Sequence, residues 1–356
     1  MQSALDNSVL AGVREPSAEA KIALAQKFFQ AQVSNLWGTA PTASFTFNPG
    51  TGILSGEANG ASTTSFTAIL GVQSIAVKVT SAAIASGNSS KVCILLVDPV
   101  QSQSFLVNSG ANLVASDCEI HVHSKAMPAA IFNAGVTLNV KRICVKGDFV
   151  IKNGGGSLPL ETSCDAVADP FVNALPKVTP GPCNYNNQVF NPGTVTINPG
   201  VYCGWTNFNG SGSLTLNPGL YIIKSGGMTF NSSWTVKGEG VTFYLVDQNA
   251  TITFNGNVNA KLNAPATGTY ANILFFEPPG LSNTNLPING TSGSSFQGLM
   301  YLPSRDVIIN SVSNVKTEKV TMVFSSLILN AMNWSVESSE KSISVGSGEG
   351  GVRLIR

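Results

Sequence analysis

The amino-acid sequence predicts a mainly β protein: a parallel β-helix, or solenoid, preceded by a small α+β segment with a long helix. Two observations predict the solenoid. A motif of an apolar residue, an asparagine and a small residue recurs along the chain, and short β-type strands recur in step with it. A period of about 20 to 25 residues without helical segments is typical of a solenoid, in which each repeat forms one turn. Helical periodicity near the N-terminus predicts the α+β segment.

The recurring asparagine is expected to form a ladder along one edge of the solenoid. Stacked turns place equivalent residues about 4.8 Å apart, so each side-chain amide can bond to the next. Asparagine also tolerates the left-handed backbone that such bends require. An antiparallel sandwich with Asn-Gly hairpin turns is the alternative, but hairpins would not keep a constant period. The expected ladder contains Asn108, Asn133, Asn209, Asn231, Asn255, Asn289, Asn310 and Asn330.

The repeats also define the expected domain organisation. Residues 1–86 form a pilin-like α+β segment, residues 87–340 the parallel β-helix, and residues 341–356 a tail. Residues 153–189 are rich in proline and contain two cysteines, so we expect them to leave the stack as a long excursion. The tail contains GSGEGG at 346–351, which matches the dinucleotide pattern G-x-G-x-x-G but is not followed by a helix.

The N-terminal segment has apolar residues at helical spacing, among them Ile22, Phe29 and Val33. Pro16 divides this region and marks a kink or a break. Residues 44–60 and 64–85 then read as strands around a turn. We therefore expect one long helix system packed on a small sheet, with a helical hairpin as the alternative.

The six cysteines favour disulfides and an oxidising compartment. None forms a CxxC pair and there are only two histidines, which argues against structural zinc. Cys93 and Cys118 open equivalent strands one turn apart, and Cys183 and Cys203 bracket another turn, where a Cα separation of about 5 Å suits a disulfide. The expected pairing is Cys93–Cys118, Cys144–Cys164 and Cys183–Cys203, with Cys118–Cys144 as the competing bridge.

Charge and hydropathy limit the partners. The formal net charge is +1 and only 11% of residues are charged, so no nucleic-acid partner is expected. No apolar run is long enough to cross a bilayer, and no signal peptide is visible. Because disulfides require export, we expect that an N-terminal targeting or anchoring segment is missing from this sequence.

Several motifs, in their order, resemble TadE/TadG-like proteins of the tight-adherence (Flp) pilus systems. MQSALDNSVLAGVRE resembles the stretch that follows their N-terminal transmembrane helix. FTAILGVQSIAVKVTSAA resembles the strand pair that closes their pilin-like segment. CILLVDP, the GPC…GVYCG spacing and LNPGLYIIKSGG resemble their β-helical region. The Asp-x-Ser-x-Ser metal motif of the von Willebrand A domains that some of these proteins carry is not in this sequence.

The resemblance implies a non-catalytic structural or adhesive protein, namely a minor pilin-like or assembly component that displays a β-helix. It implies a location in the periplasm or at the cell surface, with an inner-membrane anchor through the missing N-terminal helix. The implied partners are other pilin-like or Tad pilus subunits, and a glycan or another surface ligand. No cofactor is implied.

A carbohydrate-active β-helix enzyme, either a polysaccharide lyase or a hydrolase, is the alternative function, as is a glycan-binding module. Such an enzyme needs clustered carboxylates. Asp247, Glu277 and Asp306 follow three strands at a similar phase, and Arg305 and Lys224 lie near that phase. We interpret them as solvated residues at strand ends and expect no catalytic, cofactor-binding or metal site.

Other candidate residues are interpreted structurally. His121 and His123 alternate on one strand, with Glu119 in phase as an exposed neighbour, and this is too little for a metal site. Trp205 and Trp234 could stack on sugars, but they are out of register and at least one is expected to pack under a loop. The Asn-x-Ser/Thr triplets could accept glycans, although a ladder role is preferred where the two coincide. They begin at Asn88, Asn209, Asn231, Asn249 and Asn289.

Overall fold

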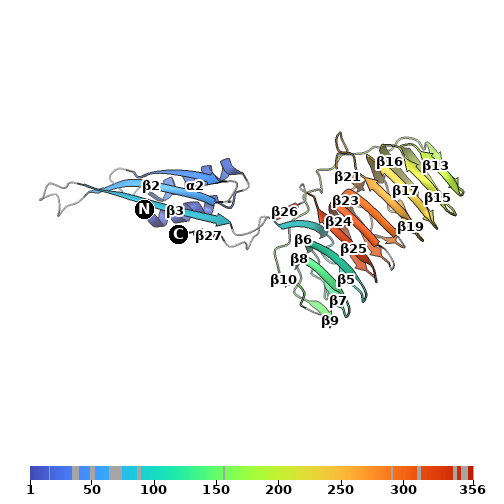
Figure 1. Cartoon of the computed structure of the whole chain (residues 1–356), viewed down its shortest axis with the longest axis horizontal. Helices are drawn as coiled ribbons and strands as arrows, with labels where there is room; N and C mark the ends of the chain where they lie inside the picture. The colour runs from blue at the N-terminus through green and yellow to red at the C-terminus, as the bar shows by residue number, and fades with distance from the viewer. Residues whose placement is uncertain are drawn as a thin grey trace. The chain divides into compact units, whose positions relative to one another are not determined.

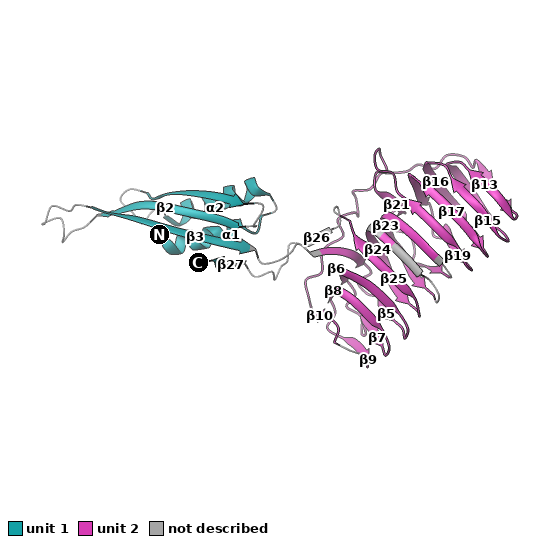
Figure 2. Cartoon of the chain, viewed as in Figure 1, with its two compact units in different colours: residues 1–89, 346–356 teal, residues 90–345 magenta. Residues whose placement is uncertain are grey.

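The computed structural model describes residues 1–15, 17–33, 40–48, 53–63, 74–85, 90–154, 157–289, 292–310, 314–339, 343–345 and 352–355. The chain divides into two compact units (Figure 2). Unit 1 contains residues 1–89 and 346–356, and unit 2 contains residues 90–345. The expectations for Pro16, Asn88 and residues 346–351 lie outside the described residues.

Unit 1 is a two-layer α+β structure. Its sheet has the order β1 (Thr42–Asn48), β2 (Ile53–Thr63), β3 (Ser74–Ala85) and β27 (Val352–Ile355), with antiparallel neighbours throughout. Helices α1 (Gln2–Gly12) and α2 (Ala18–Val33) supply the rest of its core. The buried residues of this core are Ala4, Leu5, Val9, Val13, Ala25, Phe29, Val33, Phe45, Leu54, Ala58 and Ala83.

The expected long helix is replaced by two short ones, of 11 and 16 residues. Both helices carry apolar residues that pack into the same core, so the chain must turn back between them. Gly12 lets the helices approach closely, because a Cβ atom there would lie 2.5 Å from the carbonyl oxygen of Lys21. The expected small sheet is present and shares this core with the two helices, so the structure is neither a single long helix on a sheet nor a helical hairpin alone.

The expectation of a tail at residues 341–356 was wrong for its described residues. Strand β26 (Ile343–Val345) pairs antiparallel with β4 of unit 2, and β27 pairs antiparallel with β3 of unit 1. Leu354 of β27 packs against the core of unit 1. Along the sequence, unit 2 therefore lies between β3 and β27, which are neighbouring strands of the unit 1 sheet.

Unit 2 is a parallel β-solenoid of about 11 turns. Apart from β26 with β4, its described strand pairs are parallel. The first block of strands is β4 (Ser90–Leu96), β5 (Phe105–Val107), β6 (Asn112–Val122), β7 (Ala130–Asn133), β8 (Thr137–Val145), β9 (Val150–Asn153) and β10 (Leu160–Thr162).

The second block of unit 2 runs from β11 to β25. Its strands are β11 (Tyr185–Asn186), β12 (Val189–Phe190), β13 (Gly193–Ile197), β14 (Gly200–Phe208), β15 (Gly212–Leu216), β16 (Gly219–Asn231), β17 (Trp234–Glu239), β18 (Val241–Leu245), β19 (Thr251–Asn255), β20 (Asn259–Asn263), β21 (Ile273–Phe276), β22 (Thr284–Ile288), β23 (Ser292–Ile309), β24 (Asn314–Leu329) and β25 (Asn333–Ser338). The excursion expected at 153–189 is therefore too wide, because its two ends are strands.

The turns of the solenoid are not stacked in sequence order (Figure 1). From β4 the chain proceeds through β6 and β8 to β10 at one end of the stack. It then crosses to the other end and returns through β13, β15, β17, β20 and β23 to β24 and β25. There β24 pairs with β4 and β5, and β25 pairs with β6. We call this junction between the last and the first turns the seam.

The interior of the solenoid is filled by stacked apolar side chains. Phe190, Phe208, Phe230 and Phe254 occupy the same position in four successive turns. Their neighbouring ring centroids lie 4.9, 4.6 and 5.4 Å apart, with interplanar angles of 10 to 12°. Each turn can bury its apolar edge only against a neighbouring turn, which makes the stacking cooperative.

The asparagine ladder runs unbroken through both blocks and across the seam. Each Nδ2 group donates to the Oδ1 atom of the next residue, over 2.5 to 3.3 Å. At the seam Asn108 donates to Asn330, which is 222 residues away in the sequence. In spatial order the ladder contains Asn153, Asn133, Asn108, Asn330, Asn310, Asn289, Asn255, Asn231 and Asn209.

The ladder gives a stability prediction. Replacing Asn330 by alanine removes the ladder bonds to Asn108 and Asn310, so we expect unfolding to require about 1 to 3 kcal/mol less free energy. Denaturant unfolding measures this change. The matched control is Asn186→Ala on β11, an exposed position outside the ladder, which should change the stability little. Equal unfolding midpoints for the two variants would contradict a stabilising ladder.

Candidate functional site

Residues 163–184, which we call the strap, connect the two ends of the solenoid. Disulfides attach both ends of the strap to the stack, Cys144–Cys164 at one end and Cys183–Cys203 at the other. The third disulfide, Cys93–Cys118, joins β4 to β6. All three have Cα separations of 5.5 to 5.8 Å, and the pairing is the one expected from the sequence. The competing bridge Cys118–Cys144 is not formed.

The strap covers the outer face of one solenoid sheet. Val167, Phe171, Leu175 and Val178 of the strap pack on this face. The covered residues come from successive turns of both blocks and include Val92, Leu95, Val201, Ile222, Tyr244, Ile273, Phe276, Leu299, Tyr301 and Val323. Tyr301 also donates its hydroxyl proton to Asp169, over 3.0 Å. The strap therefore bridges the seam from outside.

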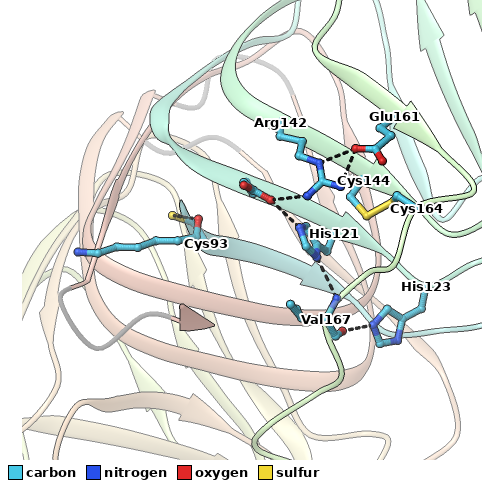
Figure 3. Close-up of polar contacts among 10 residues, drawn as sticks. Cys93, His121, His123, Arg142, Cys144, Glu161, Cys164 and Val167 are labelled. Carbon is cyan, nitrogen blue, oxygen red and sulfur yellow. Dashed lines mark hydrogen bonds and ion pairs between the residues drawn. A yellow bond between two sulfur atoms is a disulfide. The ribbon is translucent and has the colours of Figure 1, made fainter. Parts of the chain in front are cut away.

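Both histidines of the chain bind the strap at one residue, Val167 (Figure 3). The Val167 N–H donates to Nδ1 of His121 over 3.0 Å, and Nε2 of His123 donates to the Val167 carbonyl oxygen over 2.6 Å. His121 on β6 and His123, which directly follows β6, alternate with the core residues Ile120 and Val122 and so share its outer face. The contacts with Val167 explain the spacing of the two histidines without a metal ion.

The second ring nitrogen of His121 binds a network of charged side chains, Glu119, Arg142 and Glu161. Since Nδ1 of His121 accepts a hydrogen bond, its proton is on Nε2, which donates to Glu119 over 2.8 Å. Arg142 lies 3.4 Å from the same Glu119 oxygen and binds Glu161 at 2.6 Å. Glu119 is only 4% exposed, so its expected role as an exposed neighbour was wrong. The side chains of His121 and Arg142, which both bind this carboxylate, cover it.

His123 has a perturbed titration. Burial lowers the pKa of His123, and the positive charge of Lys146 and the nearby His121 lower it further. The hydrogen bond to Val167 and the carboxylate of Asp169 oppose this shift. A neutral His123 is therefore favoured while the strap is closed.

The carboxylates considered for catalysis are engaged in structural contacts. Glu277 and Arg305 form a buried ion pair at 2.6 Å, with both side chains fully inaccessible. Burial raises the pKa of Glu277, while Arg305 and the Ser304 N–H oppose the rise. The prediction that these two residues are solvated was wrong, because Arg305 binds Glu277 and the backbone of a distant loop instead of water.

The other charged candidates are separate from each other. Arg305 also donates to the carbonyl oxygens of Gln248 and Asp247, so it joins the loop after β18 to Glu277. The Asp247 carboxylate instead accepts from the Ser225 N–H, and the Asp306 carboxylate from the Ser326 hydroxyl. Lys224 has an intermediate exposure on β16. The structure thus unites Glu277 with Arg305 and leaves the three carboxylates bound to different partners.

The remaining candidates also have definite places. Trp234 is fully buried in the core, whereas the side chain of Trp205 is 50% exposed. Of the glycan-acceptor triplets, Asn249 is exposed and lies outside the ladder. Within the part of the chain that the structure describes, no group of three His, Cys, Asp or Glu residues is placed to hold a metal ion. No described helix is long and apolar enough to span a membrane.

Comparison with known proteins finds no protein-family model that matches the chain and no match among curated proteins.

The histidine contacts predict that acid weakens the strap. Burial in the closed state lowers the pKa of His123. When the strap opens, His123 regains the ordinary histidine pKa of about 6.5 and therefore binds a proton more readily as the pH falls. Strap closure should therefore be most stable above that pH and weaken as the pH falls through it. Hydrogen exchange of the Val167 amide, corrected for the intrinsic rate, measures this opening. In His123→Gln, which keeps a donor but does not titrate, the pH dependence should shrink, and an unchanged dependence would refute the assignment to His123.

Proposed function

We propose that the chain is a non-catalytic structural or adhesive component of a tight-adherence (Flp) pilus system. In this proposal it acts as a minor pilin-like or assembly protein that displays the solenoid outside the cytoplasm. One observation carries the proposal: the solenoid is braced along its length by a strap that disulfides attach at both ends. A brace of this kind resists separation of the turns, which suits a protein that transmits or withstands force.

The compartment follows from the disulfides. Three disulfides and no free cysteine indicate an extracellular or periplasmic protein. An inner-membrane anchor at the N-terminus remains part of the proposal and is supported by the resemblance of residues 1–15 to the stretch that follows such an anchor.

The division of labour between the units supports a display role. The chain leaves unit 1 after β3, enters the solenoid at β4, leaves it at β26 and re-enters unit 1 at β27. The two connections between the units therefore join neighbouring strands, β3 and β27 in unit 1 and β4 and β26 in unit 2. In our proposal unit 1 packs with other pilin-like or Tad pilus subunits through its helical layer, and the solenoid presents its lateral surface.

The non-catalytic part of the proposal rests on how the charged residues are used. Glu277 is the most buried of the three candidate carboxylates, and its oxygens accept from Arg305 and the Ser304 N–H. Asp306 and Asp247 are likewise bound to their neighbours. These contacts hold loops and strands together, and a carboxylate so engaged is a poor general acid or base.

The decisive experiment deletes the full-length gene in the organism that encodes it and examines pili by electron microscopy together with surface attachment. We expect loss of attachment with pili present for an adhesin, or loss of pili for an assembly component. Complementation with the intact gene is the control. Normal pili and normal attachment in the deletion strain would refute the proposal. Release of reducing ends or unsaturated products from glycans by the purified protein would refute its non-catalytic part.

A further inference from the structure

Trp205 combines high exposure with a firmly held position. It lies on β14, where its neighbours Thr206 and Phe208 point into the solenoid and are buried. The Trp205 side chain points outward and is 50% exposed. An exposed indole costs free energy unless something covers it, since large aromatic groups carry the largest apolar surface of any side chain.

The indole lies against a glycine. Trp205 pairs with Gly227 on β16, which in turn pairs with Thr251 on β19. A Cβ atom on Gly227 would lie 3.1 Å from Cζ3 of Trp205 and 2.5 Å from Oγ1 of Thr251. The absence of a side chain at Gly227 therefore makes room for the ring, and the Thr251 hydroxyl approaches the same glycine from the next turn.

The backbone of Trp205 is fixed by its neighbours. A β-bulge lies between Cys203 and Trp205, and bulges of this kind re-aim the following side chain. The Trp205 N–H donates to Oδ1 of Asn187 over 3.0 Å. Gly204 has φ of +68°, and a Cβ atom there would lie 2.2 Å from the same Asn187 oxygen. The disulfide Cys183–Cys203 ends two residues before the ring.

Polar side chains continue from Trp205 along the axis of the solenoid. Thr251 follows Gly227 in the next turn, and later turns present Asn285 and Asp306, which pair with each other, on the outside of the same sheet. Their outward direction follows from the inward direction of the buried neighbours Leu286 and Val307. Adjacent turns lie about 4.8 Å apart, and the sugar units of an extended glycan repeat at a similar distance.

We infer that Trp205 is the stacking platform of a glycan-binding site, with a pyranose ring on its exposed face and the chain directed along the solenoid axis. The C–H face of a pyranose is apolar and suits the indole face, while its hydroxyls match the hydroxyl and amide groups of Thr251 and Asn285. An aromatic surface with a few directed polar groups is the usual composition of a ligand site. This inference deepens the adhesive form of the proposed function and rests on it.

The test uses the purified full chain and a panel of defined oligosaccharides: cellohexaose, chitohexaose, laminarihexaose and xylohexaose. Binding is measured by calorimetry and by the change in tryptophan fluorescence. We expect at least one probe to bind, and Trp205→Ala to weaken its binding by about tenfold or more. Trp205→Phe should retain part of the affinity, because a smaller aromatic face remains. Thr251→Val should weaken binding with little change in shape.

Phe149→Ala is the matched control, because Phe149 is also a half-exposed aromatic side chain but lies in the first block, with an exposure of 46%. Its affinity should equal that of the unchanged chain. The inference is overturned if no probe binds, or if Trp205→Ala binds as well as the control. Either result leaves pili and attachment in the deletion strain to decide the proposed function separately. Loss of attachment with unchanged glycan binding in Trp205→Ala would also overturn the inference, while supporting the proposed function.

Discussion

Parallel pairing across the seam is the interaction on which the rest of unit 2 depends. The first and last turns of the solenoid meet there, through Met322 with Ile94 and Leu327 with Phe105. Without this pairing, two short stacks would each expose an apolar end in the middle of the molecule. Because both blocks run parallel and wind in the same direction, their hydrogen bonds and side-chain columns continue without a break. The asparagine ladder shows this continuity most directly, since its bond from Asn108 to Asn330 is the same as those within either block.

The strap is the consequence of that arrangement. If the second block begins at the far end of the stack, the chain must travel the length of the solenoid outside it. The strap does so as an apolar segment, and the turns beneath it present apolar residues on their outer face. A simple solenoid would have polar residues there. The disulfides at both ends and the two histidines at Val167 keep the strap in place. His121 and His123, the residues most suggestive of a metal site, therefore have a structural role.

The sequence predicts the local features of this fold well and the order of its turns poorly. The repeat, the ladder positions and the disulfide pairing are local, since each depends on spacing within one or two turns. Every turn offers the same strand and asparagine pattern, so nothing local states which turns are neighbours, and the seam could not be found. Asn153 was missed because a lysine precedes it where other copies have an apolar residue. The burial of Glu277 and Arg305 was missed because it depends on contacts between distant loops. The strands β26 and β27 are short and gain their partners only from the folded chain.

The order of the turns can be tested by cysteine cross-linking. Leu106 pairs with Ile328 across the seam and with Ile131 inside the first block, and all three point outward from the same sheet. The separation of adjacent turns lies within the range that a disulfide tolerates. We expect the double variant with cysteines at 106 and 328 to form a disulfide as readily as the control with cysteines at 106 and 131. A cross-link in the control without one between 106 and 328 would contradict the permuted stack.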